Sequence, residues 1–377
     1  MAPPGIASSV EDRRVNDTSP GTSQKDIIVL DGGFATQLSC HVQQPIDGDV
    51  LWSARFLATD KEAVIDTHLD FLRAGADLIM TNTYQASVDL FMKHLNMTAE
   101  QSYGLIKQAV DLARTAVKRY EEEFPGTRGE FLALNRPSAI EELAARTMQP
   151  PFQRVTGLAA YNFDKVLDSA LWVPYGASLH DGSEYTGSYA KNTSVNTMRD
   201  WHIPRIKALV EGGVDLLALE TIPCKVEAEM LVNLLKEQFP DTKAWLSFSV
   251  RVRRRKIYCF RENFQEVAKY CYDLNPNQIT AVGINCTAPR LIESFISGIN
   301  KDRKNKPLPL IVYPNSGENY NVELGWINRD KCEPVETYIH KWLDLGVTWV
   351  GGCCRTYAID VTRIRREVEL WKQKEKH

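Results

Sequence analysis

The sequence predicts an α/β protein, and within that class a single (β/α)8 barrel with an insertion before its third strand. Eight short apolar or β-branched runs recur along the chain, with amphipathic segments between them. Three junctions, RAGADLIMTN, EGGVDLLALE and DLGVTWVGG, share one pattern in which a helix ends at Gly and a buried strand follows. A doubly wound open sheet remains the alternative, because the same alternation of strand and helix serves both architectures.

The expected elements alternate regularly along the chain. The strands are expected at residues 27–31, 77–82, 169–174, 215–220, 244–250, 280–285, 310–313 and 348–351. The helices are expected at residues 61–74, 99–123, 198–211, 225–237, 264–273, 290–300, 335–345 and 360–374. A strand followed by a helix, eight times over, is the order that a (β/α)8 barrel requires.

Two regions fall outside this alternation. Residues 1–25 are rich in Pro, Ser, Gly, Asp and Thr and are expected to be a disordered tail, so that the barrel domain covers residues 26–377. Residues 129–168 are longer than a usual loop and are expected to be an insertion, with a short helix possible at residues 139–146.

The composition excludes several classes of protein. Hydrophobic residues make up 44% of the chain, charged residues 25%, and the net charge is −3. We expect no nucleic-acid partner, since the one basic run, at residues 251–256, is typical of a solvated strand end or loop. No stretch approaches the roughly 20 apolar residues that span a bilayer, and the N-terminus has no apolar signal core. A cytoplasmic protein acting on small molecules is expected; the oligomeric state stays open, with a monomer favoured.

Three of the eight cysteines fall at expected strand ends. Cys286 follows the sixth strand, whereas Cys353 and Cys354 follow the eighth, so all three point to the rim where barrels of this class carry their active sites. A catalytic zinc usually has three protein ligands and an open fourth position, which this trio would provide. A vicinal disulfide between Cys353 and Cys354 is the alternative. The remaining cysteines are expected to be small hydrophobes: Cys40, Cys224, Cys259, Cys271 and Cys332.

Three anionic sulfurs suit the activation of a thiol better than that of water, because they weaken the Lewis acidity of the metal. Glu220 ends an apolar strand and needs a cation, either a substrate ammonium group or a neighbouring Lys or Arg. Asp31 ends the first strand, and the N–H groups of Gly32 and Gly33 could bind a carboxylate. Together these groups would fit an amino-acid thiol.

Six segments resemble the homocysteine S-methyltransferases over nearly all of the chain from Asp31 onward. They are DGGFATQL, TNTYQAS, VPYGASLHDGSEYTGSY, LLALETIPCKVEAE, GINCT and GGCCRT. The resemblance implies a (β/α)8 barrel in which Cys286, Cys353 and Cys354 bind Zn²⁺, with the sulfur of homocysteine as a further ligand. It also implies contacts to the amino group from Asp31 and Glu220. The remainder of the homocysteine pocket is expected at Gly32, Gly33, Ser53 and Asn285.

The methyl donor depends on other residues. The betaine-using branch of the family has Tyr where this chain has Gln85, and a quaternary ammonium favours such an aromatic wall. The residues TYQAS look more like the corresponding segment of enzymes that use the sulfonium donors S-methylmethionine or S-adenosylmethionine. We therefore expect S-methylmethionine as donor and methionine as product, with the donor beside Trp52, Tyr84, Gln85 and Tyr175.

Several alternatives remain open at this point. Betaine could be the donor, and selenocysteine could replace homocysteine. Residues 170–173 are bulkier than the usual family segment and directly follow the insertion. A catalytically impaired, zinc-binding scaffold protein with a blocked pocket is therefore the alternative from another class.

Overall fold

The computed structural model describes residues 27–125, 167–253, 256–259, 262–303, 306–321 and 325–375. The expected tail at residues 1–25 lies outside this range. So does nearly all of the expected insertion at residues 129–168, including the helix considered at residues 139–146. These three expectations stay predictions.

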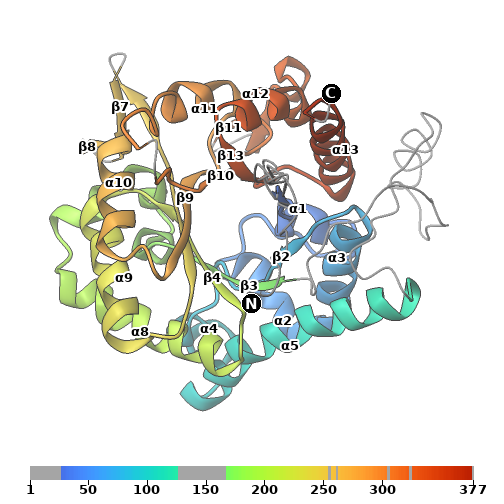
Figure 1. The fold of residues 1–377 in the computed structure, drawn as a ribbon. Coiled ribbons are helices and arrows are strands. Elements are labelled where there is room, and N and C mark those ends of the chain that lie inside the picture. The colour runs from blue at the N-terminus through green and yellow to red at the C-terminus, as the bar shows by residue number, and fades with distance from the viewer. Residues whose placement is uncertain are drawn as a thin grey trace, which may run out of the picture.

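One parallel sheet of eight strands forms the centre of the molecule, in the order β1-β13-β10-β9-β5-β4-β3-β2 (Figure 1). In chain order the strands are β1 (Ile28–Val29), β2 (Leu78–Met80), β3 (Leu167–Trp172), β4 (Leu216–Ile222), β5 (Ala244–Phe248), β9 (Ile279–Asn285), β10 (Leu310–Tyr313) and β13 (Val347–Val350). Each lies where the sequence predicts a strand. Every residue of β4, β5 and β10 is buried, as expected for parallel strands covered on both faces.

The two outer strands of this order, β1 and β2, approach each other at their ends. Leu30, directly after β1, forms one isolated parallel bridge with Leu78 of β2. Two backbone hydrogen bonds flank it, from Asp31 N to Leu78 O at 3.0 Å and from Asp77 N to Val29 O at 2.7 Å. The predicted parallel α/β class is confirmed, whereas the described residues form no continuous β1–β2 ladder that would close the sheet.

Helices surround the sheet (Figure 1). The α-helices are α1 (Phe34–Leu38), α2 (Phe56–Thr59), α3 (Lys61–Arg73), α4 (Val88–Leu95), α5 (Ala99–Glu123), α7 (Ser183–Thr186), α8 (Val195–Glu211), α9 (Lys225–Gln238), α10 (Phe264–Leu274), α11 (Pro289–Ile296), α12 (Ile339–Asp344) and α13 (Ala358–Lys374). The start of α5 illustrates why they begin where they do: Thr98 Oγ1 accepts a hydrogen bond from the Gln101 N–H, and the Thr98 N–H donates to Gln101 Oε1.

Glycines end the helices that precede three of the strands. Gly75, Gly213 and Gly346 have φ values of 94°, 83° and 91°, in the left-handed region that favours glycine. They precede β2, β4 and β13, respectively. The repeated helix–Gly–strand junction predicted from the sequence is therefore present at all three places.

Two small antiparallel sheets were not predicted. One consists of β6 (Arg251–Arg253), β7 (Lys256–Cys259) and β8 (Glu262–Asn263), and the other of β11 (Asn319–Asn321) and β12 (Gly325–Ile327). In Figure 1 the first of them projects beyond the helices. Of the basic run, residues 251–253 and 256 thus belong to an antiparallel ribbon.

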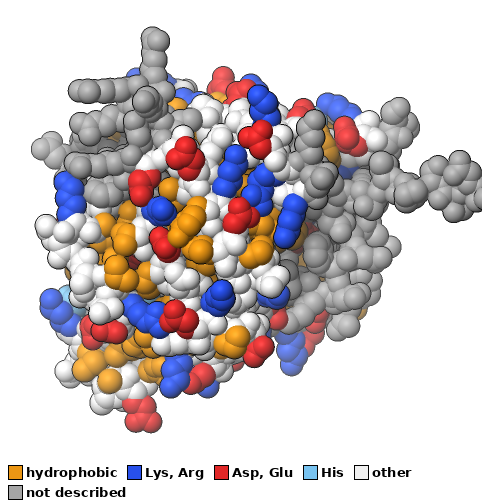
Figure 2. Space-filling view, turned by 60° about the vertical axis from the view of Figure 1, so that its left-hand side comes forward, with side chains coloured by type: hydrophobic (Ala, Val, Ile, Leu, Met, Phe, Trp, Pro, Cys, Tyr) orange, Lys and Arg blue, Asp and Glu red, His pale blue; other side chains and the backbone are white. Residues whose placement is uncertain are grey.

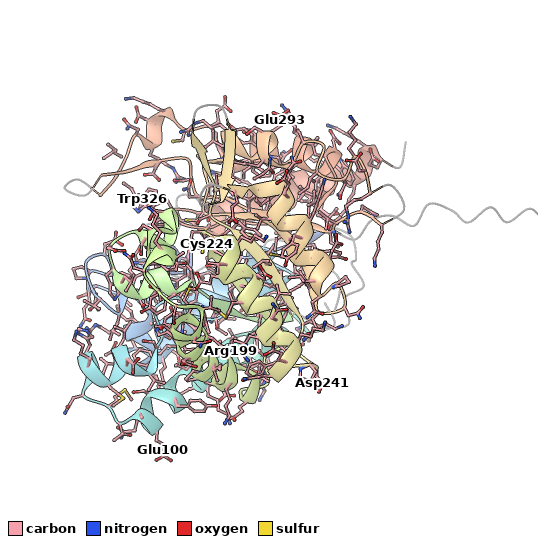
Figure 3. The ribbon with its side chains drawn as sticks, turned by 90° about the vertical axis from the view of Figure 1, so that its left-hand side faces the viewer. Glu100, Arg199, Cys224, Asp241, Glu293 and Trp326 are labelled. Atoms are coloured by element: carbon pink, nitrogen blue, oxygen red, sulfur yellow. The ribbon has the colours of Figure 1, made fainter. Side chains whose placement is uncertain are left out.

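The described surface mixes charges of both signs. Figure 2 shows acidic and basic side chains interspersed with apolar ones on one face, rather than a block of one sign. No helix among the described residues is long and apolar enough to cross a membrane. Figure 3 places Cys224 in the interior at the start of α9, as predicted for a structural cysteine, and Asp241 at the periphery.

Candidate metal centre

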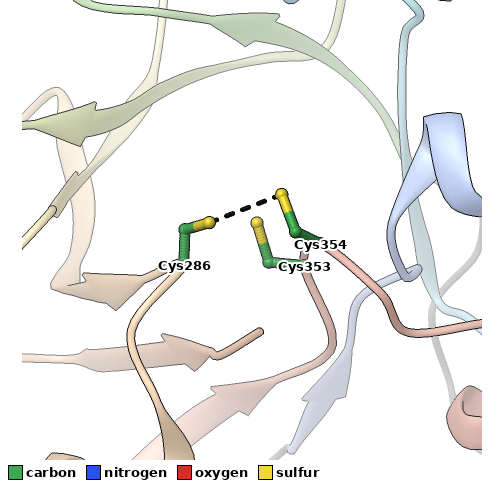
Figure 4. A group of neighbouring side chains, drawn as sticks. All are labelled: Cys286, Cys353 and Cys354. Atoms are coloured by element: carbon green, nitrogen blue, oxygen red, sulfur yellow. Dashed lines mark hydrogen bonds between the residues drawn. The ribbon is translucent and has the colours of Figure 1, made fainter. Parts of the chain in front are cut away.

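Three cysteine thiols meet at one end of the sheet. Cys286 follows β9, Cys353 and Cys354 follow β13, and β10 lies between these two strands. The three Sγ atoms all lie within 4.8 Å of one another, and Cys286 Sγ is 3.5 Å from Cys354 Sγ (Figure 4). All three are free thiols, so the vicinal disulfide considered from the sequence is not formed. The trio that the sequence grouped is thus a cluster in space.

Close packing explains the two glycines before Cys353. A Cβ atom on Gly351 would lie 2.6 Å from the Cβ of Leu30, and one on Gly352 would lie 2.2 Å from Thr356 Oγ1. These distances are shorter than real Cβ contacts, so glycine lets the loop pass Leu30, directly after β1, and fold closely against Thr356. The glycines bring the cysteine loop against its neighbours.

Several residues at this rim have left-handed backbone conformations although they are not glycine. Thr221 has φ 59°, Cys286 φ 47° and Arg355 φ 65°. Each such residue costs of order 1–3 kcal/mol and persists only where the surrounding structure enforces it, which is common at functional sites. These strained residues lower the stability of the fold, and in return they orient side chains at this rim.

The electrostatics of the trio favour a bound cation. Hydrogen bonds from the Cys353 and Cys354 thiols, together with the Tyr185 hydroxyl, hold the pKa of Cys286 well below its usual range, although burial opposes this. The hydrogen bond to that thiolate in turn raises the pKa of Cys353 and of Cys354. A positive ion bound between the three sulfurs would stabilise their ionised forms. Three sulfur donors suit a borderline-soft metal such as zinc.

Two buried carboxyl groups lie close to the cysteines. Asp31 is 0% exposed and Glu220 2%. Burial raises the pKa of Glu220 well above its usual range, and the charges of Cys286 and Asp31 add to this effect, while a hydrogen bond from Tyr313 opposes it. Burial likewise raises the pKa of Asp31, although the N–H of Met80 donates to its Oδ2 at 2.7 Å.

Each of these acids keeps one oxygen without a hydrogen-bond partner, Oδ1 of Asp31 and Oε2 of Glu220. Among the described residues no Lys or Arg forms an ion pair with Glu220, so the structural salt bridge considered from the sequence is not seen. The two acids therefore form a buried, electronegative pair that a cationic group would stabilise.

The glycines after Asp31 behave differently from the prediction. The N–H of Gly33 donates to Thr356, to its carbonyl oxygen at 2.9 Å and its Oγ1 at 3.1 Å. It is thus engaged within the fold, and of the predicted pair of carboxylate-binding amides only Gly32 stays a candidate. Ser53 is buried, and its carbonyl accepts a hydrogen bond from Asn82 Nδ2 at 2.7 Å.

The four donor-side candidates divide into two groups. Trp52 and Tyr84 meet edge to face with their ring centroids 5.5 Å apart. Burial and the charges of Glu184, Glu220, Cys286 and Cys354 raise the pKa of Tyr84, which lies near both the acids and the thiols. Gln85 Nε2 donates to Ala177 O at 3.3 Å, and Tyr175 packs 5.5 Å from Trp201 on α8. The structure therefore brings Trp52 and Tyr84 together, and it bonds Gln85 to the segment that carries Tyr175, which itself packs on α8.

Three residues near the cysteines were missed. Tyr185 of α7 lies with its hydroxyl 3.7 Å from Cys286 Sγ. Its neighbour Glu184 has a buried oxygen without a partner, and burial raises its pKa. Tyr313 of β10 accepts a hydrogen bond from Trp245 Nε1 at 2.9 Å and reaches Glu220. The segment GSEYTG contained the only available signal for the first two.

Asn285 holds the end of β4 in place. Its Oδ1 accepts from Thr221 N at 2.8 Å and its Nδ2 donates to Thr221 Oγ1 at 2.7 Å. These contacts fix the left-handed residue next to Glu220, so a direct role of Asn285 in substrate binding stays a prediction.

Asn285→Ala is expected to lower the free energy of unfolding by about 1–3 kcal/mol, because it leaves buried groups of Thr221 unpaired. Urea denaturation measures this loss. Asn300→Ala is the matched control, since Asn300 makes the same two-sided contact with Leu308. Both variants should lose stability, but only Asn285→Ala should also lose turnover. Full activity in Asn285→Ala would contradict the view that Asn285 positions Glu220 by fixing Thr221.

Comparisons with known proteins bear on this site. A model of the family described as homocysteine S-methyltransferase matches residues 28–368. The betaine-homocysteine S-methyltransferase of Drosophila melanogaster is 41% identical over 351 residues, covering 92% of this chain and 95% of the relative. Homocysteine S-methyltransferase 1 of Arabidopsis thaliana is 35% identical over 345 residues, covering 90% and 93%.

A solved structure is also similar. The metallated form of the homocysteine methyltransferase MmuM from Escherichia coli superimposes with a TM-score of 0.69 at 30% identity. The match covers 91% of this chain and 96% of that one.

Proposed function

The chain belongs to the homocysteine S-methyltransferase family, and we propose that it transfers a methyl group from S-methylmethionine to homocysteine, with zinc bound by Cys286, Cys353 and Cys354. The observation that carries this proposal is the arrangement of three thiols within 4.8 Å of one another beside two buried carboxyl groups. That arrangement matches the sulfur and the amino group of one small substrate.

The metal is supported by the donor set and by the metallated form of MmuM. When bound, zinc lowers the pKa of a substrate thiol so that the thiolate is present at neutral pH. The remaining contributions come from the protein. Asp31 and Glu220 bind the ammonium group, which relieves the cost of their own burial and orients the substrate sulfur toward the cysteines.

Methyl transfer is then a direct displacement. The substrate thiolate forms a bond to the methyl carbon, and the carbon–sulfur bond of the sulfonium breaks, leaving its electron pair on the donor sulfur. Both products are methionine, and the thiol proton has left to solvent. The paired rings of Trp52 and Tyr84 offer the donor cation a π-rich wall near the cysteines.

We also infer that the sheet closes into a (β/α)8 barrel and that residues 26–377 form one domain around it. The bridge between Leu30 and Leu78 supports closure. So does an inner apolar cluster to which strands on both sides of that bridge contribute, among them Ile28, Leu78 and Ile311. Inward side chains packed in this way are typical of barrels.

Betaine is the second candidate donor, favoured by the 41% identical relative from Drosophila melanogaster that is named for it. The amide of Gln85 favours the sulfonium donor, because it occupies a position where an aromatic ring would suit a quaternary ammonium. The carbonyl of Ala177 binds this amide and keeps it in place.

The decisive experiment assays purified protein with homocysteine and either donor, measuring methionine. We expect kcat/KM at least about tenfold higher with S-methylmethionine, a difference that specific pocket contacts readily give. Gln85→Tyr should shift the ratio toward betaine. Higher kcat/KM with betaine in the unaltered protein would reverse the choice of donor, and no methionine from either would refute the proposed reaction.

A further inference from the structure

We propose that Arg205 of helix α8 is a positioning residue for the methyl donor, because it fixes the loop of residues 83–86 that carries Tyr84 and Gln85. This inference rests on the proposed function. It concerns a residue outside the cysteine and carboxylate groups already described.

The guanidinium of Arg205 gathers the carbonyl groups of that loop. Arg205 Nε donates to Ala86 O at 2.7 Å, and its Nη2 lies 3.3 Å from both Thr83 O and Tyr84 O. The side chain comes from a different part of the chain, yet it contacts almost every residue of this short loop. Only a planar, forked donor satisfies several carbonyls that converge in this way.

Burying the guanidinium of Arg205 has a free-energy cost that its hydrogen bonds must offset. Arg205 is only 3% exposed, and burial lowers its pKa to about 9, so the group stays cationic at neutral pH. Placing a guanidinium in the interior is unfavourable unless its donors are satisfied. The loop carbonyls provide that compensation, and in return the loop is held in one conformation.

Residues 83–86 connect Arg205 to the proposed active site. Tyr84 contacts Trp52, and the charges of Cys286 and Cys354 act on it. Gln85 continues to the next loop through its hydrogen bond to Ala177 O. A shift of residues 83–86 would therefore move the proposed donor wall without moving the cysteine loops, which follow β9 and β13.

A second contact joins Arg205 to the same side of the site. Its guanidinium lies 4.3 Å from the ring centroid of Trp201, and Trp201 packs edge to face against Tyr175 with centroids 5.5 Å apart. Tyr175 belongs to the segment that includes Ala177. Helix α8 thus supports both donor-side loops through neighbouring side chains, and its effect should fall on the donor rather than on the thiol or the metal.

The test compares Arg205→Met with the unaltered enzyme. We expect kcat/KM for the donor to fall by about 10- to 100-fold, since a small misplacement of reacting groups can cost that much. Homocysteine affinity, measured by calorimetry, and zinc content should be unchanged. Arg114→Met is the matched control: Arg114 donates to the carbonyls of Gly212 and Gly213, which precede β4 at the opposite end of the sheet, and this variant should keep its donor kinetics.

Arg205→Lys carries the test if the methionine variant does not fold. Lysine keeps the charge but not the fork, so the donor KM should still rise, by less, with the same homocysteine affinity. An active enzyme whose donor KM is unchanged in these variants would overturn the positioning role alone. Equal losses of donor kinetics, homocysteine affinity and zinc would also overturn it, because they would indicate a general structural role. An unaltered protein without turnover would instead refute the proposed function.

Discussion

Cys354→Ala is expected to abolish turnover, lowering kcat/KM by about three orders of magnitude or more, because metal activation of a nucleophile contributes several kcal/mol. Cys354 Sγ lies 3.5 Å from Cys286 Sγ and within 4.8 Å of Cys353 Sγ. Removing it leaves two sulfur donors, fewer than the three protein ligands of a catalytic zinc site. Zinc content by elemental analysis should fall together with kcat.

Cys40→Ala is the control for this variant, since Cys40 is exposed, contrary to its prediction as a small hydrophobe, and the chemical change is the same. It should retain both zinc and activity. Full turnover in metal-free Cys354→Ala protein would refute the metal centre, whereas loss of activity with zinc retained would assign the cysteine a different role.

Glu220→Gln is expected to weaken homocysteine binding by about two orders of magnitude, because truncating one partner of a buried charge pair typically costs about 2–5 kcal/mol. The carboxyl group is buried and its Oε2 has no hydrogen-bond partner, so the incoming ammonium group meets an unsatisfied acceptor. The amide keeps the shape of the side chain but removes the charge. Calorimetric titration with homocysteine measures the loss directly.

An amine-free thiol, 4-mercaptobutyrate, separates this role from a general effect on the pocket. The unaltered protein should bind it much more weakly than homocysteine, and Glu220→Gln should add little further loss. Glu336→Gln alters another acid with one buried oxygen that lacks a hydrogen bond, although Arg363 pairs with its other oxygen, and it should change neither affinity. Equal weakening of both thiols by Glu220→Gln would contradict ammonium recognition.

The main sheet could be predicted from the sequence because strands that are buried on both faces are recognisable as continuous apolar runs. Strands such as β4 and β10 are continuous apolar runs, and the glycines at 75, 213 and 346 mark where each preceding helix must turn. The antiparallel ribbons were missed since short, partly charged strands such as β6 resemble loops when read alone. Their pairing depends on partners that no local pattern identifies.

The candidate site was predictable only where it lies at strand ends. Cys286 and Cys353 could be brought together from the strand order alone, because parallel strands place their carboxyl ends at one edge. Tyr185 lies in the long segment between β3 and α8, and its approach to Cys286 depends on how that segment folds back. Tyr313 reads as an ordinary core aromatic, since nothing in LIVY indicates that its hydroxyl reaches Glu220.

The left-handed backbone at Thr221, Cys286 and Arg355 has a consequence for how this protein can change over time. Glycine would adopt these conformations more easily, so selection for heat resistance alone would favour it at all three positions. Each such replacement would remove a side chain from the rim that carries the cysteine cluster. Thermostability and catalysis therefore compete at these positions, and a stabilised variant of this enzyme would best acquire its mutations in the outer helices instead.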